Sequence, residues 1–424
     1  MKTKAVRIYG KNDLRLEEFE LPPIKDNEIL AQVTCDSICM SSNKAAKQGV
    51  EHKRIPNDVD KNPTIIGHEF SGILIEIGEK WKKSFQPGMK FSIQPAINYP
   101  HGPIGILSAP GYSYKYIGGD ATYIIIPNEV MAQDCLLPYT GQGYYPGALA
   151  EPLSCVIGAM HANYHTNPGS YIHKMEIVDG GNMAILAGVG PMGLAAINYA
   201  IHRQDKKPGL MVVTDIDQDR LDRAASLYSP AEAKKNNIDL RYINTKDMSD
   251  PVKGLLDLTN GKGYNDVFVF APVPSVIEQG DALLAFDGCL NFFAGPSDPN
   301  FSAKFNFYNI HYNFTHIVGT SGGNNDDMVE ALDMMSKGLD PAGLVTHIGG
   351  LDAVIDTTCN LPKIPGGKKL IYTNISMPLT PISEFEEKGN TDPLFQKLDE
   401  LCNKYNGLWN IEAEEFLIAN GKSI

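Results

Sequence analysis

Short runs of alternating apolar and polar residues occupy most of the first 150 positions of the chain. Such runs are EILAQVTC (28–35), GILIEIGEKW (72–81), PGMKFSIQP (87–95) and ATYIIIPNEV (121–130), and Pro, Gly and Asn separate them. Alternation with a period of two is typical of strands that bury one face. Between Ile93 and Ala121 the chain is rich in Gly, Pro and Tyr, which indicates a long ordered loop. We therefore predict a β-rich domain, a distorted barrel of short strands.

From about residue 155 to 320 apolar strands alternate with helical segments instead. MAILAG (183–188) and LMVVTD (210–215) have the composition of buried strands, and PMGLAAINYAIHR (191–203) between them has that of a helix. DVFVFAP (266–272) and CLNFFAG (289–295) continue the series of strands. This alternation is typical of βαβ units around a parallel sheet, so the expected fold is α/β, with a doubly wound Rossmann domain beside the β-rich one.

The C-terminal part of the chain combines a predicted strand with predicted helices. Residues 324–338 are expected to form a helix and residues 367–375 a strand, whereas 392–405 and 410–421 have the pattern of two amphipathic helices. The predicted division is a β-rich catalytic domain at 1–156, a nucleotide-binding domain at 157–320, and a return to the catalytic domain with a helical extension at 321–424.

Composition and charge exclude several classes of partner. With 43% apolar and 21% charged residues, the 424-residue chain is an ordinary globular protein. Its 37 Lys and Arg against 50 Asp and Glu give a net charge of -13, which repels nucleic acid and anionic membranes. No run of about 20 apolar residues and no signal-peptide core is present, so we expect a cytoplasmic protein. The seven scattered cysteines are expected to be reduced thiols.

A glycine-rich turn lies between the first predicted strand and helix of the nucleotide domain. The pattern G-x-G-x-x-G allows a tight turn, a close approach of pyrophosphate to the backbone, and close packing of helix on strand. Asp215 ends the next strand, 22 residues after the last glycine, where a carboxylate can bind both ribose hydroxyls of NAD and repel the extra phosphate of NADP. Arg220 is either a second ribose contact or a solvated helix charge. The predicted cofactor residues, with NAD(H) favoured over NADP(H), are Gly188, Gly190, Pro191, Met192, Gly193, Asp215 and Arg220.

One thiol, one imidazole and two carboxylates form a candidate metal site in the first half of the chain. They are Cys39, His68, Glu69 and Glu151, which are donors of the kinds that zinc accepts. A purely structural role is also open to each of them, because His68 and Glu69 could occupy a surface turn. Cys39 could be a small buried apolar residue, and Glu151 could be a charge at a helix N-terminus.

The motifs together resemble those of the zinc-dependent medium-chain alcohol and polyol dehydrogenases. The resemblance runs from residue 1 to about 375 and rests on SICMSSN, GHE, EPLS, GVGPMG, TDID, FFAG, GTSGG and LVTHIGGLD, which follow the family's order. It implies that Cys39 and His68 bind zinc, with Glu69 or Glu151 as the third ligand. No cysteine lies between residues 93 and 121, where many relatives hold a structural zinc, so a single catalytic zinc is expected.

The resemblance also implies roles for the residues that follow Cys39. Ser41 matches the hydroxyl that relays the alcohol proton. Ser42 replaces the family's usual aspartate beside the zinc histidine, which should alter the basicity of that ligand. Lys44 stands where some alcohol dehydrogenases have a relay histidine, so the resemblance leaves the proton exit route open.

Within the family, the cysteine-free loop, the serine pair and the C-terminal fifty residues are most similar to the L-sorbose-1-phosphate reductases. This implies the interconversion of a ketose phosphate and a polyol phosphate, L-sorbose 1-phosphate and D-glucitol 6-phosphate. Lys44, Lys47, Arg54 and Lys115 are candidates for the phosphate contact, although a solvated surface charge is the commoner role for each of them. Relatives commonly pair edge strands of the nucleotide domain, so a homodimer or homotetramer is expected.

Three further functions are compatible with parts of the sequence. A dehydrogenase of unphosphorylated polyols or secondary alcohols would keep the same metal site. A zinc-free quinone-type reductase would lack the residues Cys39, His68 and Glu151 that this chain has. A non-catalytic NAD-binding sensor would have an intact glycine turn and a damaged metal site, of which Ser42 is the one indication.

Overall fold

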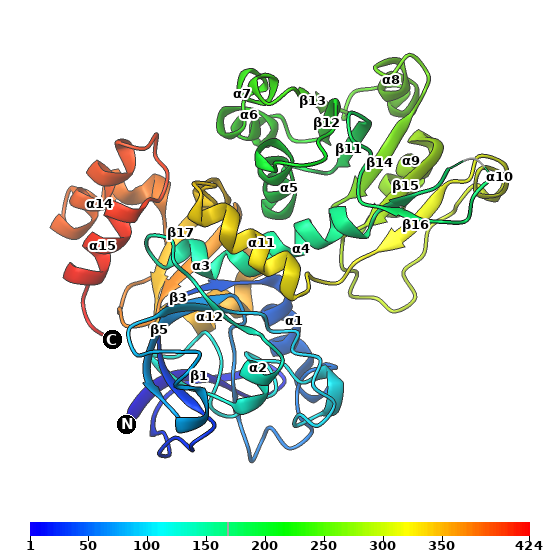
Figure 1. Cartoon of the computed structure of the whole chain (residues 1–424). Coiled ribbons are helices and arrows are strands. Elements are labelled where there is room, and N and C mark those ends of the chain that lie inside the picture. The colour runs from blue at the N-terminus through cyan, green and yellow to red at the C-terminus, as the bar shows by residue number, and fades with distance from the viewer. Residues whose placement is uncertain (168) are drawn as a thin grey trace. The chain divides into compact units, whose positions relative to one another are not determined.

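The computed structural model describes residues 1–167 and 169–424. The chain forms two compact units: unit 1 comprises residues 1–151 and 328–424, and unit 2 comprises residues 152–327. In Figure 1, unit 1 runs from blue to cyan and again from dark yellow to red, and unit 2 runs from green to yellow. The predicted boundaries were 156 and 320, whereas the unit boundaries fall inside helices α4 (Ala150–Ala162) and α11 (Asn325–Ser336). A helical pattern continues through both boundaries, so nothing in the sequence shows where one unit ends and the other begins.

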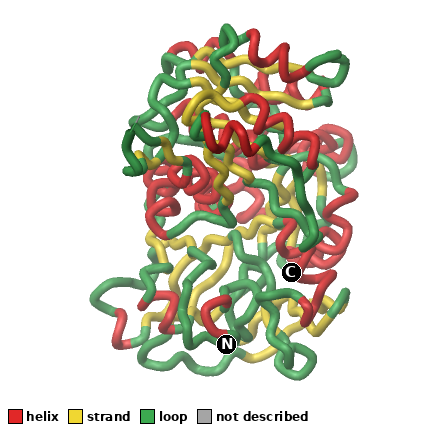
Figure 2. Tube along the Cα trace, turned by 90° about the vertical axis from the view of Figure 1, so that its right-hand side faces the viewer, coloured by secondary structure: helices red, strands yellow, loops and turns green. Residues whose placement is uncertain are grey.

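Unit 1 is built on an eight-stranded sheet and a three-stranded sheet. The large sheet has the order β19-β17-β18-β3-β5-β6-β8, with β7 also paired to β3, and the small one has the order β2-β1-β4. Around the N-terminus strands and loops predominate, as Figure 2 shows. The strands are β1 (Lys2–Gly10), β2 (Asp13–Glu20), β3 (Ile29–Ile38), β4 (Thr64–Ile65), β5 (Phe70–Ile77), β6 (Lys90–Ile93), β7 (Tyr123–Ile126), β8 (Leu136–Pro138), β17 (Val345–Gly350), β18 (Lys368–Tyr372) and β19 (Thr380–Pro381).

Alternating apolar side chains of these strands form the core of unit 1, as the sequence pattern predicted. One cluster of buried residues includes Ile29, Ala31 and Val33 from β3 together with Phe70 and Leu74 from β5. Short helices connect the strands of unit 1. They are α1 (Met40–Gln48), α2 (Asn128–Ala132), α3 (Tyr145–Ala148), α12 (Val354–Asn360) and α13 (Phe385–Gly389), with single 3-10 turns at Gly49–Glu51, Glu79–Trp81, Gly105–Leu107, Ala342–Leu344, Leu351–Ala353, Leu361–Lys363 and Ile382–Glu384.

The predicted long loop lies between β6 and β7, and its regular structure is the 3-10 turn Gly105–Leu107. The loop packs against the turn that precedes β5. Gly119 N donates to Gly67 O over 2.7 Å, and a Cβ on Gly111 would lie 2.0 Å from that same oxygen. The absence of a side chain at Gly111 therefore allows the loop to hold the segment in which His68 lies.

Unit 2 contains a six-stranded parallel sheet of order β13-β12-β11-β14-β15-β16. The strand order reverses between β11 and β14, which confirms the doubly wound Rossmann prediction. The strands are β11 (Asn182–Leu186), β12 (Leu210–Asp215), β13 (Asp239–Asn244), β14 (Tyr264–Val269), β15 (Leu284–Phe292) and β16 (His316–Gly319), beside a hairpin of β9 (Tyr164–His165) and β10 (Lys174–Met175). The helices are α5 (Pro191–His202), α6 (Gln218–Leu227), α7 (Pro230–Lys235), α8 (Pro251–Asp257), α9 (Pro274–Leu283) and α10 (Phe307–Tyr312).

The two amphipathic helices predicted near the C-terminus are present as α14 (Pro393–Asn403) and α15 (Ile411–Asn420). Side chains at their starts cap them: Asp392 accepts from Leu394 N, and Asn410 accepts from Ala413 N. Within the described residues, no helix is both long and apolar enough to span a membrane.

Candidate metal centre

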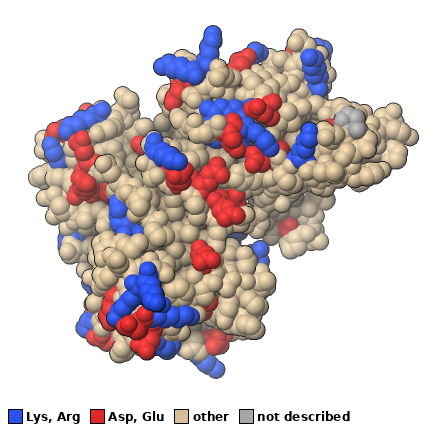
Figure 3. Space-filling model, in the orientation of Figure 1, with Lys and Arg blue, Asp and Glu red and all other residues tan. Residues whose placement is uncertain are grey.

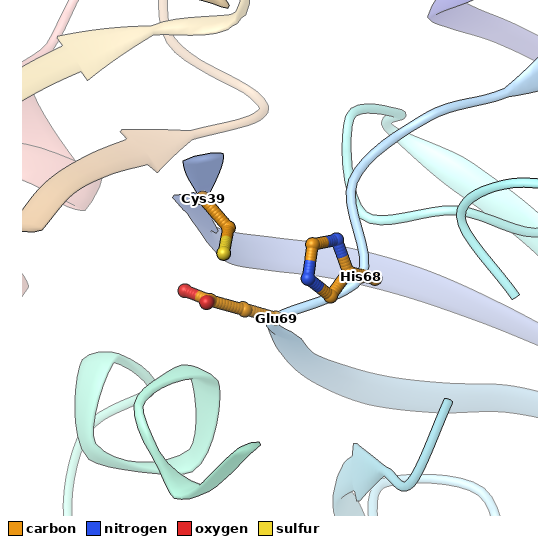
Figure 4. Close-up of side chains that lie close together, drawn as sticks. All are labelled: Cys39, His68 and Glu69. Carbon is orange, nitrogen blue, oxygen red and sulfur yellow. The ribbon is translucent and has the colours of Figure 1, made fainter. Parts of the chain in front are cut away.

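Two chain turns bring the predicted donors Cys39, His68 and Glu69 together. Cys39 follows the end of β3 and precedes α1, while His68 and Glu69 directly precede β5. Gly67 has a φ of +90°, and a Cβ there would lie 2.6 Å from Asp120 N, so this turn requires glycine. One donor atom from each of Cys39, His68 and Glu69 lies within 4.8 Å of the other two, and the three side chains converge in Figure 4.

The imidazole of His68 is buried and is held at both nitrogens. Ser42 Oγ lies 3.3 Å from Nδ1, and Tyr112 Oη lies 3.3 Å from Nε2. Burial lowers the pKa of His68 to about 4, because a charged imidazole there would lose its hydration. The ring is therefore neutral at physiological pH, which is the form that a metal ion binds.

The thiol of Cys39 lies in an environment that opposes its ionisation. Burial raises its pKa to about 12, and the charges of Glu69 and Glu151 contribute to the rise. A bound divalent cation would reverse this effect, because it stabilises the thiolate directly. The chemistry of the three donors fits zinc, which accepts sulfur, imidazole and carboxylate together.

Glu69 is paired with a residue that the sequence interpretation did not include. Lys368 Nζ, at the start of β18, lies 2.5 and 2.6 Å from the two carboxylate oxygens of Glu69. Both side chains are buried, at 6% and 1% exposure. Burial opposes the charge on each of them. The attraction of the pair outweighs burial, so the pKa of Lys368 is raised and that of Glu69 is lowered.

Glu151 lies in the first turn of α4 and is half-buried. It does not belong to the group of three converging donors. Its negative charge nevertheless contributes to the raised pKa of Cys39 and to that of Lys368.

Tyr112 is a second residue that the sequence interpretation missed. It lies in the long loop, is 5% exposed, and its hydroxyl lies 3.3 Å from His68 Nε2. Burial raises its pKa, and Ser41 partly opposes that rise. Its ring stacks on His52 at a centroid distance of 5.7 Å, and the guanidinium carbon of Arg54 lies 5.9 Å from the Tyr112 centroid. Nothing in the sequence distinguishes this tyrosine from the others of the loop.

The other predicted residues near the metal centre differ in exposure. Ser41 and Lys44 lie in α1 and are half-buried, and the charge of Lys44 contributes to lowering the pKa of His52. Lys47 and Lys115 are exposed, and Lys115 Nζ lies over the ring of Tyr116.

In unit 2 the glycine turn has the predicted geometry. A Cβ on Gly193 would lie 2.1 Å from Gly188 O, so the third glycine allows α5 to pack closely on the turn. Gly190 caps α5, which begins with Pro191 and Met192. A Cβ there would meet only Arg220 Nη2, at 3.5 Å, within the described residues. The turn thus has the open backbone that a pyrophosphate requires.

A hollow of about 640 Å³ lies at the carboxyl end of β12. Asp215 and Arg220 both line it, and Asp215 Oδ1 accepts from the backbone N–H groups of Ile216 and Asp217 at 2.8 and 3.2 Å. Lys246 lies on the same wall. The predicted ribose-binding residues are therefore together in one hollow.

Comparison with known proteins decides the family. Residues 25–137 match the alcohol dehydrogenase GroES-like domain, and residues 191–337 match the zinc-binding dehydrogenase domain. The L-sorbose 1-phosphate reductase of Klebsiella pneumoniae is 49% identical, over 100% of this chain and 98% of that protein. The chain belongs to the zinc-binding dehydrogenases. The mannitol-1-phosphate 5-dehydrogenase of Aliivibrio fischeri, another relative, is also 49% identical, over 98% of this chain and 97% of that protein.

Solved structures share the fold of this zinc-binding dehydrogenase. The 2R,3R-butanediol dehydrogenase from Bacillus subtilis superposes with a TM-score of 0.69 at 22% identity, over 88% of this chain and 100% of that one. The protein is thus an oxidoreductase of the medium-chain zinc type, and its family uses zinc and a nicotinamide cofactor.

Proposed function

We propose that this zinc-binding dehydrogenase interconverts a ketose phosphate and a polyol phosphate, with L-sorbose 1-phosphate and D-glucitol 6-phosphate as the pair. The convergence of the Cys39, His68 and Glu69 donors carries the proposal, because it provides the metal site that such a reaction needs. The printed activities of the two relatives at 49% identity support the substrate class.

Cys39, His68 and Glu69 would hold the single zinc ion, and Glu151 would act beside it through its charge. The donor distances favour Glu69 over Glu151 as the third ligand. The ion pair with Lys368 fixes the orientation of the Glu69 carboxylate, as partners of metal ligands commonly do. When bound, zinc supplies Lewis-acid polarisation of the carbonyl oxygen, and the nicotinamide supplies or accepts the hydride.

Ser41 and Tyr112 are proposed to move the proton. Burial raises the pKa of Tyr112 well above its usual value, so its phenol remains protonated at neutral pH. Ser41 would donate its hydroxyl proton to the substrate oxygen, and Tyr112, whose pKa Ser41 lowers, would return a proton to Ser41. Lys44, in the next turn of α1, is the proposed route to solvent.

Arg54 is the proposed phosphate contact among the four cations considered. Its guanidinium lies over Tyr112, whose hydroxyl lies 3.3 Å from His68 Nε2, so the positive charge is close to the metal centre. Arg54 Nη1 also donates to Leu107 O over 3.0 Å, and this hydrogen bond fixes one side of the guanidinium group. Positive and negative side chains are interspersed on the face shown in Figure 3, which favours a local cation over a broad basic surface on that face as the phosphate contact.

The Arg54→Gln variant is expected to lose affinity for the phosphorylated substrate selectively. A hydrogen bond to a charged group contributes about 1.5–3 kcal/mol, so KM for the ketose phosphate should rise about tenfold or more. KM for the corresponding free ketose should change little. Steady-state kinetics on both substrates measure this, with the exposed Lys115→Gln as the matched control. Equal effects on both substrates would remove Arg54 from the phosphate site.

The same assay tests the proposed function and the preference for NAD. Turnover of ketose phosphates at much higher kcat/KM than free ketoses supports the proposal, whereas the reverse order favours the alternative, a dehydrogenase of unphosphorylated polyols or secondary alcohols. The Asp215 carboxylate supports NADH over NADPH, because it would repel a 2′-phosphate. A preference for NADPH would contradict that part of the proposal.

A second copy of the chain is the proposed occupant of the sheet edge at β16. Within the described residues β16 pairs on one side only, with β15. The apolar side chains exposed on β16 and the segments beside it are Phe286, Phe307, Tyr308, Tyr312, Phe314 and Ile317. An unpaired edge with apolar neighbours favours strand pairing between copies.

The Ile317→Lys variant is therefore expected to dissociate the homo-oligomer. A charge on the edge strand opposes pairing with a second strand. Light scattering coupled to gel filtration should give the mass of a dimer or tetramer for the parent protein and of a smaller species for the variant. Ile418→Lys, at an exposed position of α15 in unit 1, is the control. An unchanged mass in Ile317→Lys would contradict pairing through β16.

A further inference from the structure

A fully buried carboxylate joins the C-terminal extension to the rest of unit 1. Glu414 lies in α15 and is 0% exposed. Its Oε2 accepts from Tyr144 N at 2.6 Å, and its Oε1 accepts from Tyr145 N and Tyr372 Oη, both at 2.8 Å. Trp409, also 0% exposed, donates from Nε1 to Tyr372 Oη over 2.7 Å. Two backbone N–H groups, a phenol and an indole therefore share one hydrogen-bonded network around this side chain.

One branch of the network leads toward Glu151. Tyr144 and Tyr145 begin α3, and α4, which carries Glu151 in its first turn, starts two residues after α3 ends. Glu414 thus binds two N–H groups at the start of the segment that carries Glu151, whose charge contributes to the raised pKa values of Cys39 and Lys368. A Cβ on Gly143, where φ is +65°, would lie 2.3 Å from Glu414 Oε2, so the chain before α3 also follows the carboxylate closely.

The other branch leads toward Glu69. Tyr372 ends β18, and Lys368, the partner of Glu69, begins it. The antiparallel register of β18 with β3 pairs Tyr372 with Cys35. Strand β3 continues from there to the residue that precedes Cys39. The hydrogen bond from Tyr372 to Glu414 therefore anchors the strand that positions Lys368.

Burial raises the pKa of Glu414 to about 7, and the hydrogen bonds from Tyr144, Tyr372 and Tyr145 and the charge of Lys90 oppose the rise. Removal of the carboxylate would leave the half-buried N–H group of Tyr144, the buried N–H group of Tyr145 and the buried phenol of Tyr372 with one acceptor fewer. Unsatisfied buried donors are costly, so the segments that they belong to would move to find other partners.

We infer that Glu414 is a positioning residue for the metal centre, through which the C-terminal extension fixes the segments that carry Glu151 and Lys368. The inference rests on the proposed zinc site. The extension lies outside the residues that match the two family models, 25–137 and 191–337, so membership of the family does not by itself imply this role.

The Glu414→Gln variant tests the inference, with Glu415→Gln at an exposed position of the same helix as the control. The readouts are zinc affinity, measured by competition with a chelator, and the visible absorption of the cobalt-substituted full-length protein. Glu414→Gln is expected to bind zinc about tenfold more weakly, as variants of residues behind metal ligands commonly do, and to shift the cobalt bands. Glu415→Gln should match the parent protein in both measurements.

Two results would overturn the inference and are distinguishable from failure of the zinc site itself. A folded Glu414→Gln with the parent's zinc affinity and cobalt spectrum would limit Glu414 to general stability. If Glu414→Gln does not fold, Tyr372→Phe removes one of the hydrogen bonds and should shift the cobalt bands in the same direction by a smaller amount. An unshifted spectrum in that variant would also overturn the inference. Absence of zinc binding by the parent protein would instead refute the proposed function.

Discussion

Cys39→Ser is expected to lose its bound zinc and about a thousandfold of kcat/KM. The serine hydroxyl is a far weaker zinc ligand than a thiolate, and without the metal the reaction loses several kcal/mol of transition-state stabilisation. KM for the nicotinamide cofactor should change little, because its glycine turn lies in unit 2. Metal analysis and steady-state kinetics measure the two effects.

The half-buried Cys359 provides the matched control, since Cys359→Ser removes a thiol elsewhere in unit 1. That variant should retain both zinc and activity. Full zinc content and parental activity in Cys39→Ser would exclude the thiol as a ligand.

Lys368→Met is expected to destabilise the metal-free protein by about 3–5 kcal/mol. The substitution leaves the Glu69 carboxylate buried without the cation that compensates it, which is among the most destabilising changes known for a buried pair. Unfolding of unit 1 in urea, followed by tryptophan fluorescence, should give a lower midpoint. The double variant Glu69→Gln/Lys368→Met should recover much of the loss, because it removes the uncompensated charge as well.

Lys369→Met is the comparison for this effect. Lys369 is also buried, but its Nζ donates to the carbonyl oxygens of Pro365 and Gly367 at 3.0 and 2.6 Å, and burial lowers its pKa to about 8. Removing the Lys369 cation does not leave a buried carboxylate without its partner. The loss of stability should therefore be smaller than in Lys368→Met. Equal destabilisation by the two variants would mean that the ion pair between Lys368 and Glu69 contributes no more to the unfolding free energy than the hydrogen bonds of Lys369 do.

The fold was predictable because its two halves have different periodicities. Alternation with a period of two marked the strands of unit 1, and buried strands separated by helices marked the parallel sheet of unit 2. The glycine turn was predictable because the motif needs residues without side chains for steric reasons. At Gly193, for example, a Cβ would collide with Gly188 O. The boundaries between the units were harder to predict from the sequence, because α4 and α11 continue through them without a change of helical pattern.

The converging donors Cys39, His68 and Glu69 could be proposed from residue type and motif, whereas their partners could not. Lys368 and Lys369 are consecutive lysines in an apolar strand. That pattern indicates a buried positive charge that needs a partner. It does not show that the partner is Glu69, which lies about 300 positions away in the sequence. Tyr112 is one tyrosine in a loop with several. Only contacts between distant segments distinguish these residues from solvated ones.

Glu414 illustrates the same limit in the C-terminal extension. Helix α15 contains Glu412, Glu414 and Glu415, and an amphipathic pattern assigns glutamates to the solvent face. Glu414 faces inward instead, because two backbone N–H groups and a phenol of other segments provide hydrogen bonds there.

X-ray absorption spectroscopy of the purified protein at the zinc edge, together with zinc stoichiometry, tests the metal centre most directly. We predict one zinc per chain with one sulfur ligand, at least one imidazole and oxygen ligands, and loss of the sulfur contribution in Cys39→Ser. A protein prepared with ample zinc that contains none, or a zinc environment without sulfur, would contradict the proposed centre.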